Sequence, residues 1–188
     1  MKTPNDIKNQ LVRWIKSDCY YNYSEHDVLI EELCFVERKA RADLVYANGK
    51  MTAFEIKSPA DNLSRWRLQH DAYLRVFDSV WLCCHYKHAM KAIGMSSDVV
   101  GIIVVDDSDS GMAVLRQAKC NKNYSRYDVI SLLWRSELDD LCRDNDIRVI
   151  SKERISEARE RVLTELHFDI IKNKVLESIK LRYREKSY

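Results

Sequence analysis

The sequence predicts an α/β fold, with a mixed β-sheet core flanked by helices and a helical C-terminal part. Short apolar runs rich in β-branched residues, which are typical of strands, alternate with segments whose apolar residues recur at helical spacing. An Asn-Gly pair between two apolar runs predicts an antiparallel hairpin, and a strand–helix–strand order after it predicts a parallel pair. Beyond Asn121 the pattern is helical throughout. The sheet should therefore contain both antiparallel and parallel strands.

The N-terminal segments predict one helix followed by an antiparallel meander. In "PNDIKNQLVRWIK", Ile7, Leu11 and Trp14 recur at helical spacing. The next apolar segment, "DVLIEELCFV", reads as a strand. "RADLVYANGKMTAFEIKS" reads as two strands joined at Asn48-Gly49, where a two-residue turn requires φ > 0 at both residues. Three antiparallel strands should therefore begin the sheet.

Pro59 ends this meander, and a helix is expected over "DNLSRWRLQHDAYLRVF", with Leu68 and Ala72 on its buried side. Two unbroken apolar runs, "SVWLCCH" and "VVGIIVVD", predict strands buried on both faces, joined by the short helix "YKHAMKAIG". "GMAVLRQAK" can add an edge strand. The part before the helical tail therefore alternates strands and helices.

The chain is expected to contain two parts. Residues 1–119 would form the α/β core, and residues 120–188 would form a helical C-terminal region. The helices of this region are predicted over "YDVISLLWRSELDDLCRDN" and "KERISEARERVLTELHFDIIKNKVLESIKLRYREK". Two roles stay open for the region: a subdomain packed on the core, or a surface that binds DNA or a partner.

Composition is that of an ordinary globular protein, with 46% apolar and 32% charged residues. No apolar run approaches the roughly 20 residues that span a bilayer, so no membrane association is expected. The start is too polar for a signal peptide, and a cytoplasmic location is expected. Most of the tryptophans lie at core spacing and should be buried: Trp14, Trp66, Trp81 and Trp134.

Charged residues inside the predicted strands are the notable feature of the sequence. Asp43 lies within one apolar run, and Glu55 and Lys57 end the next. Burying such charges costs several kcal/mol per ion, of the order of 5, unless they are paired or bind a metal. Because alternate strand residues share a face, Glu55 and Lys57 point the same way, and Asp43 can join them across the hairpin. Glu32 on the preceding strand, or else Glu31, can supply a further carboxylate.

This set of residues suits metal-dependent phosphodiester chemistry. Mg²⁺ prefers carboxylate oxygens and completes its coordination with water and substrate phosphate. A metal so held lowers the pKa of a bound water and polarises the phosphoryl group. Lys57 can orient that water and offset the developing charge. The sequence therefore predicts a Mg²⁺ or Mn²⁺ site and hydrolysis of nucleic acid.

At these residues the chain resembles the PD-(D/E)XK nuclease superfamily, which has the restriction-endonuclease-like fold. Asp43 and Glu55-Ile56-Lys57 match its signature, with Ala42 in place of the usual Pro, and Gln69 and Tyr73 resemble the Q-x-x-x-Y motif of RecB-like members. Over roughly residues 28–145 the chain is similar to a small family of bacterial and phage nuclease-like proteins. The resemblance implies metal binding by Asp43, Glu55, the Ile56 carbonyl and Glu32, catalysis by Lys57, and supporting roles for Arg65, Gln69 and Tyr73.

Other interpretations of these residues stay open. An E-x-K triplet is common by itself, and Glu37-Arg38-Lys39 is a second copy that we assign to a solvated turn. Asp43, Glu55 and Lys57 could form an edge-strand ion pair, and Gln69 and Tyr73 an ordinary helix surface. The alternative function is a binding module on the same fold that holds nucleic acid or a protein without cutting it.

Basic residues suggest the partner. A stretch free of acidic residues carries four predicted phosphate contacts: Arg116, Lys119, Lys122 and Arg126. DNA is the expected partner, with RNA left open. No zinc-finger or helix-turn-helix signature indicates a sequence reader. A homodimer would suit a cutter of both duplex strands, but the sequence does not decide this.

Overall fold

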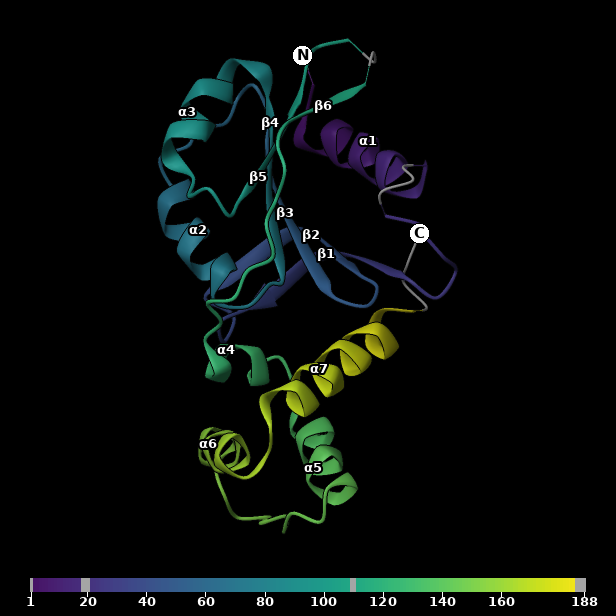
Figure 1. Ribbon diagram of the computed structural model, residues 1–188, viewed down its shortest axis with the longest axis vertical. Coiled ribbons are helices and arrows are strands. Elements are labelled where there is room, and N and C mark those ends of the chain that lie inside the picture. Colours follow the sequence, from purple (N-terminus) through teal and green to yellow (C-terminus); the bar gives the residue numbers. More distant parts are fainter. Residues whose placement is uncertain (1, 18–20, 109–110, 185–188) are drawn as a thin grey trace.

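A computed structural model describes residues 2–17, 21–108 and 111–184 and contains one six-stranded mixed sheet with helices on both faces (Figure 1). Strands β1 to β3 pair antiparallel, β3 to β5 pair parallel, and β6 is antiparallel to β5. The strands lie in chain order across the sheet: β1 Val28–Phe35, β2 Ala40–Ala47, β3 Met51–Lys57, β4 Ser79–His85, β5 Gly101–Val105 and β6 Met112–Arg116. The predicted fold class is confirmed.

Helices occupy the segments where helical spacing was found, although their bounds differ from those expected. They are α1 Pro4–Ser17, α2 Trp66–Leu74, η1 Tyr86–His88, α3 Ala89–Met95, α4 Arg126–Ile130, α5 Arg135–Asp144, α6 Ile155–Glu165 and α7 Phe168–Tyr183. The helix expected near Asn62 begins only at Trp66, and Leu68 on it is 80% exposed rather than buried. The buried positions of α2 are Trp66 and Tyr73. This orientation turns Gln69 and Tyr73 toward the sheet.

The hairpin between β2 and β3 is present, but its predicted turn type is wrong. Three residues, 48–50, separate the strands, and Asn48 N–H donates to the Lys50 carbonyl at 3.1 Å. Neither Asn48 nor Gly49 adopts a left-handed φ. The longer loop removes the requirement for φ > 0 at both positions that a two-residue turn imposes.

Two hydrophobic layers lie on opposite faces of the sheet. Helix α1 covers one face, where Ile7, Leu11 and Ile15 pack with Leu44, Phe54, Trp81 and other residues of the strands. Helices α2 and α3 lie on the opposite side of the sheet (Figure 1). Burial on both faces accounts for the unbroken apolar runs of β4 and β5.

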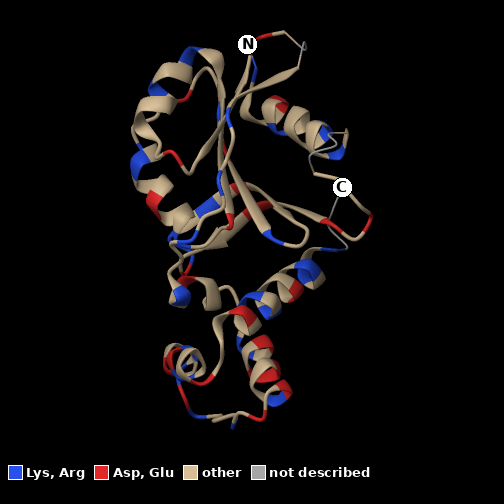
Figure 2. Ribbon diagram, in the orientation of Figure 1, with Lys and Arg blue, Asp and Glu red and all other residues tan. Residues whose placement is uncertain are grey.

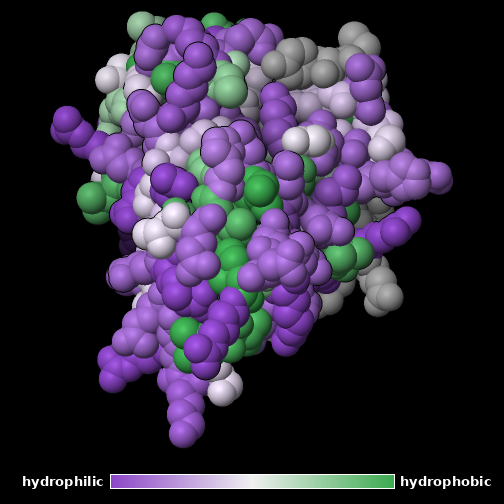
Figure 3. All heavy atoms as spheres, turned by 60° about the horizontal axis from the view of Figure 1, so that its bottom comes forward, coloured by the Kyte–Doolittle hydropathy of each residue, from purple (hydrophilic) through white to green (hydrophobic). Residues whose placement is uncertain are grey.

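The C-terminal helices pack on the core instead of standing off it. Val129, Ile171 and Ile179 belong to the same buried cluster as Val28 and Ile30 of β1. Lys172 of α7 contacts Asp78 beside β4 at 2.6 Å. On the face that carries these helices, apolar side chains form a strip among hydrophilic ones (Figure 3). Both acidic and basic residues occur along α5, α6 and α7 (Figure 2).

Gly101 at the start of β5 tests the packing between β4 and β5. A Cβ at this position would overlap the indole carbons of Trp81, which is 1% exposed. We expect Gly101→Ala to lower the free energy of unfolding by about 1–3 kcal/mol, because the buried ring must move. The matched control is Gly94→Ala, where a Cβ meets nothing within 4 Å. Urea unfolding that shows equal stability for both variants would contradict this packing.

Candidate functional site

The predicted carboxylates converge where β2 and β3 separate. The last paired residues are Leu44 and Phe54, and Asp43 lies just beyond them. There the Asp43 Oδ2 accepts a hydrogen bond from the Ile56 main-chain N–H at 2.7 Å. A side chain thus replaces the main-chain partner that the strand has lost. The divergence opens the end of the sheet around Asp43.

Glu55 is the centre of a buried hydrogen-bonded cluster, and its side chain is 2% exposed. Its Oε1 accepts from Lys57 Nζ at 2.6 Å and from Gln69 Nε2 at 2.7 Å, while Oε2 accepts from the Tyr73 hydroxyl at 2.5 Å. Lys57 Nζ also donates to Gln69 Oε1 at 3.2 Å. The residues of the E-x-K and Q-x-x-x-Y patterns therefore form one connected network.

Helix α2 supplies two of the Glu55 partners from successive turns. Gln69 and Tyr73 are four residues apart, so their side chains lie on the same side of the helix. Tyr73 is 1% exposed, and its burial together with the neighbouring Glu55 carboxylate holds the pKa of its hydroxyl well above the usual range. Tyr73 therefore acts as a hydrogen-bond donor that fixes Glu55 in place.

Asp43 is held in an electrostatically unfavourable position. Burial raises the pKa of its carboxyl group to about 7, and the charge of Glu55 adds to the increase. The Ile56 N–H and the Lys57 ammonium lower this pKa, but by less, and Glu32 raises it further. A cation placed between the two carboxylates would relieve this repulsion.

These side chains line a cleft of about 370 Å³. Its walls come from strands β1, β2 and β3, from the turn after β3, from α2 and from the start of α1: Pro4, Asn5, Lys8, Glu32, Asp43, Glu55, Ile56, Lys57, Asp61 and Gln69. Lys8 and Asp61 carried no signal in the sequence, because their place at the cleft results from the packing of α1 and from the turn after β3. Asp61 accepts hydrogen bonds from the N–H and hydroxyl of Ser58, which shapes that turn.

The two candidates for the upstream carboxylate have different surroundings. Glu31 pairs with Lys8 of α1 at 2.5 Å. Glu32 lines the cleft and pairs with Arg41 at 2.6 Å, and its φ of 57° is left-handed and interrupts the regular pairing of β1 with β2. Such irregularities re-aim side chains. Of the two residues, Glu32 is the one placed toward Asp43.

The donor set fits a hard divalent cation with few protein ligands. In the described part of the chain, no three His, Cys, Asp or Glu side chains are grouped closely enough to hold a metal ion by themselves. Asp43, Glu55 and the Ile56 carbonyl are the donors that we assign to a metal, with Glu32 at the edge of the cleft, while Asp61 is engaged by Ser58. Mg²⁺ commonly takes one or two carboxylates and keeps several waters. These residues therefore suit Mg²⁺ or Mn²⁺ better than zinc.

The other predicted nucleic-acid contacts are not gathered at this cleft. Arg65 is exposed just before α2. Within the acid-free stretch, Arg116 donates to the Val100 carbonyl at 2.8 Å, Lys119 pairs with Asp98 at 2.6 Å, and Arg126 lies over the Phe168 ring at 5.3 Å. Lys122 is exposed. A role for these residues in binding DNA stays a prediction.

Comparison with known proteins places the chain in a family. A family model described as Bacteriophage P4 protein cII matches residues 1–188. The chain belongs to this family. Protein cII of Enterobacteria phage P4 is 27% identical over 184 residues, which make up 97% of this chain and 68% of that protein. Neither description names an activity, so the function has to be argued from the site.

One solved structure also resembles the chain. The SPO1766 protein of unknown function from Silicibacter pomeroyi is 17% identical, and the match covers 81% of this chain and 99% of that one with a TM-score of 0.48. In the described residues, no helix is long and apolar enough to cross a membrane.

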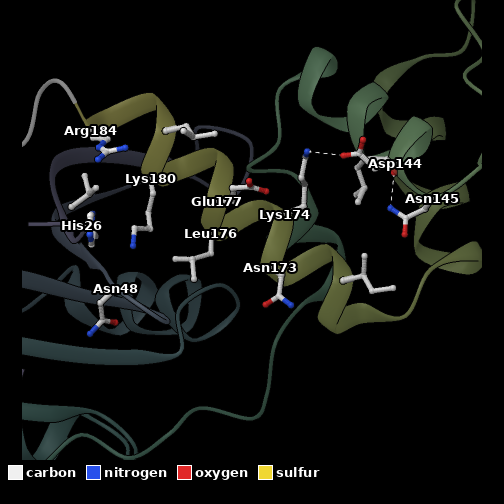
Figure 4. Close-up of a pocket in the computed structure, with 14 residues that line it drawn as sticks. His26, Asn48, Asp144, Asn145, Asn173, Lys174, Leu176, Glu177, Lys180 and Arg184 are labelled. Atoms are coloured by element: carbon white, nitrogen blue, oxygen red, sulfur yellow. Dashed lines mark hydrogen bonds and ion pairs between the residues drawn. The ribbon is translucent and has the colours of Figure 1, made fainter. Parts of the chain in front are cut away.

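A second hollow, of about 680 Å³, lies beside α7 and away from the Asp43 cluster (Figure 4). Lys174 pairs there with Asp144 at 3.1 Å, and Leu176 and Lys180 project from the same helix. The hollow is not lined by Asp43, Glu55, Lys57, Gln69 or Tyr73. The cleft around Asp43 is therefore the candidate for chemistry, because it combines buried carboxylates with an ammonium.

Proposed function

We propose that the protein is a Mg²⁺- or Mn²⁺-dependent nuclease that hydrolyses phosphodiester bonds of DNA. The observation that carries this proposal is the meeting of Asp43, Glu55 and Lys57 in one cleft, with an Asp43 carboxyl whose pKa is raised to about 7. Perturbed carboxyls in a cleft are typical of functional sites. The same proposal includes membership of the PD-(D/E)XK nuclease superfamily, which the sequence resembles. It also includes a cytoplasmic location and a role in phage DNA processing, repair or defence.

The residues of the cluster have separate roles in this proposal. Asp43, Glu55 and the Ile56 carbonyl would hold the metal, with Glu32 as a further ligand. When bound, the metal supplies a water of lowered pKa and polarises the phosphodiester group. Lys57 lies between Glu55 and Gln69, where its ammonium can orient the attacking water and stabilise negative charge on the phosphate. Gln69 and Tyr73 hold Glu55 in position.

One observation favours the alternative of a binding module without catalysis. Glu55 already accepts three hydrogen bonds, from Lys57, Gln69 and Tyr73, and these use most of the acceptor capacity of its carboxylate before any metal binds. A protein that only binds would keep this network closed. The nuclease proposal requires Glu55 to bind the metal beside these partners or in place of one of them.

A cleavage assay separates the two proposals. Wild type and the double variant Glu55→Ala, Lys57→Ala are incubated with labelled linear duplex, single-stranded and branched DNA and with RNA, in Mg²⁺, Mn²⁺ or EDTA. The nuclease proposal expects metal-dependent cutting of at least one substrate by wild type alone. Binding of a substrate with no cutting under any condition would favour the binding module. Size-exclusion chromatography with light scattering would test the proposed homodimer.

A further inference from the structure

We propose that a groove next to the candidate metal cleft binds single-stranded nucleic acid and leads it into the cleft. The groove, of about 760 Å³, lies between the edge strand β1 and the C-terminal helices. Glu32 lines both the groove and the cleft that holds Asp43. The groove's role as a substrate path rests on the proposed function, whereas binding to the groove is measured without cleavage.

Trp134 supplies a surface on which a base can stack. It lines the groove and is 57% exposed, contrary to its expected place in the core. Its main-chain N–H donates to Glu137 at the start of α5 at 2.7 Å, and the Arg182 guanidinium lies 4.5 Å from its ring centroid. Stacking on an exposed ring requires an unpaired base, which a single strand offers and an intact duplex does not.

The charged lining of the groove is predominantly basic. Four arginines, Arg38, Arg135, Arg159 and Arg182, face two glutamates, Glu32 and Glu37. Arg135 is neutralised by Asp139 at 2.9 Å and Arg182 by Glu137 at 2.9 Å. These two arginines are therefore fixed parts of the wall, and the other two decide the charge that a ligand meets.

Arg159 and Arg38 provide that charge. The side chain of Arg159 is 9% exposed; it donates to the Ser131 and Leu133 carbonyls at 2.9 and 3.2 Å and forms an ion pair with Glu37 at 3.5 Å, which offsets part of its charge. Arg38 is exposed and has no hydrogen bond or ion pair within the described ranges. Arg38 therefore contributes most of the positive charge in this part of the groove, and that charge attracts phosphate.

The backbone of the same wall is strained. Glu32, Val36, Glu37 and Arg38 have φ of 57°, 49°, 52° and 67°, all in the left-handed region. Non-glycine residues in this region cost about 1 kcal/mol or more each and concentrate at functional sites. This backbone conformation, held by the surrounding structure, places Glu32 at the junction with the cleft and Arg38 at the rim of the groove.

Binding is tested by fluorescence anisotropy in EDTA with labelled single-stranded DNA, single-stranded RNA and blunt duplex DNA. We expect wild type to bind both single strands more tightly than the duplex. Trp134→Ala should raise the Kd for single strands about tenfold, since one stacking contact is lost, while Trp134→Phe should stay close to wild type. Arg38→Gln should reduce the slope of log K against log salt by about 0.7.

Two control variants remove similar groups elsewhere. Met90→Ala removes a side chain that is 82% exposed on α3, and Arg13→Gln removes an exposed charge on α1; both should bind as wild type does. Circular dichroism confirms folding. The proposed role of the groove would be overturned if Trp134→Ala bound single strands as tightly as wild type does. It would also be overturned if wild type bound duplex more tightly than single strands. Absence of Mg²⁺-dependent cleavage would instead contradict the proposed nuclease activity. A loss of binding in Trp134→Ala would, in that case, still support single-strand binding by the groove.

Discussion

Lys57→Met is expected to lower metal-dependent cleavage by about 10²–10⁴-fold. The Lys57 side chain is only 12% exposed, and its ammonium is the one that contacts Glu55 in the cleft, at 2.6 Å. Met keeps the length and packing of the aliphatic part but cannot orient water or stabilise charge on a phosphate. The measurement is the single-turnover rate with excess enzyme on the substrate that the cleavage panel identifies.

The matched control for this variant is Lys50→Met. Lys50 is an exposed lysine at the other end of β3, in the hairpin loop, so its replacement removes the same charge away from the cleft. It should cleave as wild type does. If Lys57→Met and Lys50→Met both cleaved at the wild-type rate, Lys57 would have no catalytic role.

Asp43→Asn is expected to stabilise the metal-free protein, and the gain in stability should be markedly larger at pH 8 than at pH 5. The Asp43 carboxyl has a pKa of about 7 in the folded protein, against an ordinary value of 3.8 for an aspartate. Because the folded state holds this proton more tightly, the contribution of Asp43 to stability is complete below about pH 4 and is lost as pH rises through 7. At about 1.4 kcal/mol per pH unit the loss is about 4 kcal/mol at most. Asn carries no charge and can still accept from the Ile56 N–H.

Urea unfolding in EDTA at pH 5 and pH 8 measures this effect. Wild type should lose stability between the two values relative to Asp43→Asn. Asp71→Asn, which changes a carboxylate that is 77% exposed on α2, serves as the control and should show no such gain at pH 8. A variant Asp43→Asn that is less stable than wild type at pH 8 would show that the ionised carboxylate is not strained in the metal-free protein.

Much of the core was predictable because it depends on local patterns. Alternation and β-branched residues predicted the strands, and the side-chain period of two placed Glu55 and Lys57 on one face. The i, i+4 spacing predicted that Gln69 and Tyr73 share one side of a helix, whereas their place beside Glu55 was implied only by the resemblance to the Q-x-x-x-Y motif. These features depend on residues that are close in the sequence and on the register of the β2–β3 hairpin.

Other features depend on tertiary packing, which the sequence does not display. The left-handed φ of Glu32 interrupts β1 without a glycine to mark it. The continuous helix expected after Tyr127 is broken between Ile130 and Arg135, where Leu133 is buried and Trp134 is exposed. The start of α1 reaches the cleft through contacts with residues about 30 to 50 positions away. The burial that raises the pKa of Asp43 also arises only when these parts assemble.

The most direct test of the account is the binding of Mn²⁺ to the protein at pH 8, measured by calorimetry for wild type and Asp43→Asn. This measurement needs no knowledge of the substrate. The account predicts saturable binding by wild type, abolished or weakened by at least tenfold in Asp43→Asn, which stays folded. Equal binding by the two proteins, or binding by neither, would contradict a metal site built on Asp43 and Glu55.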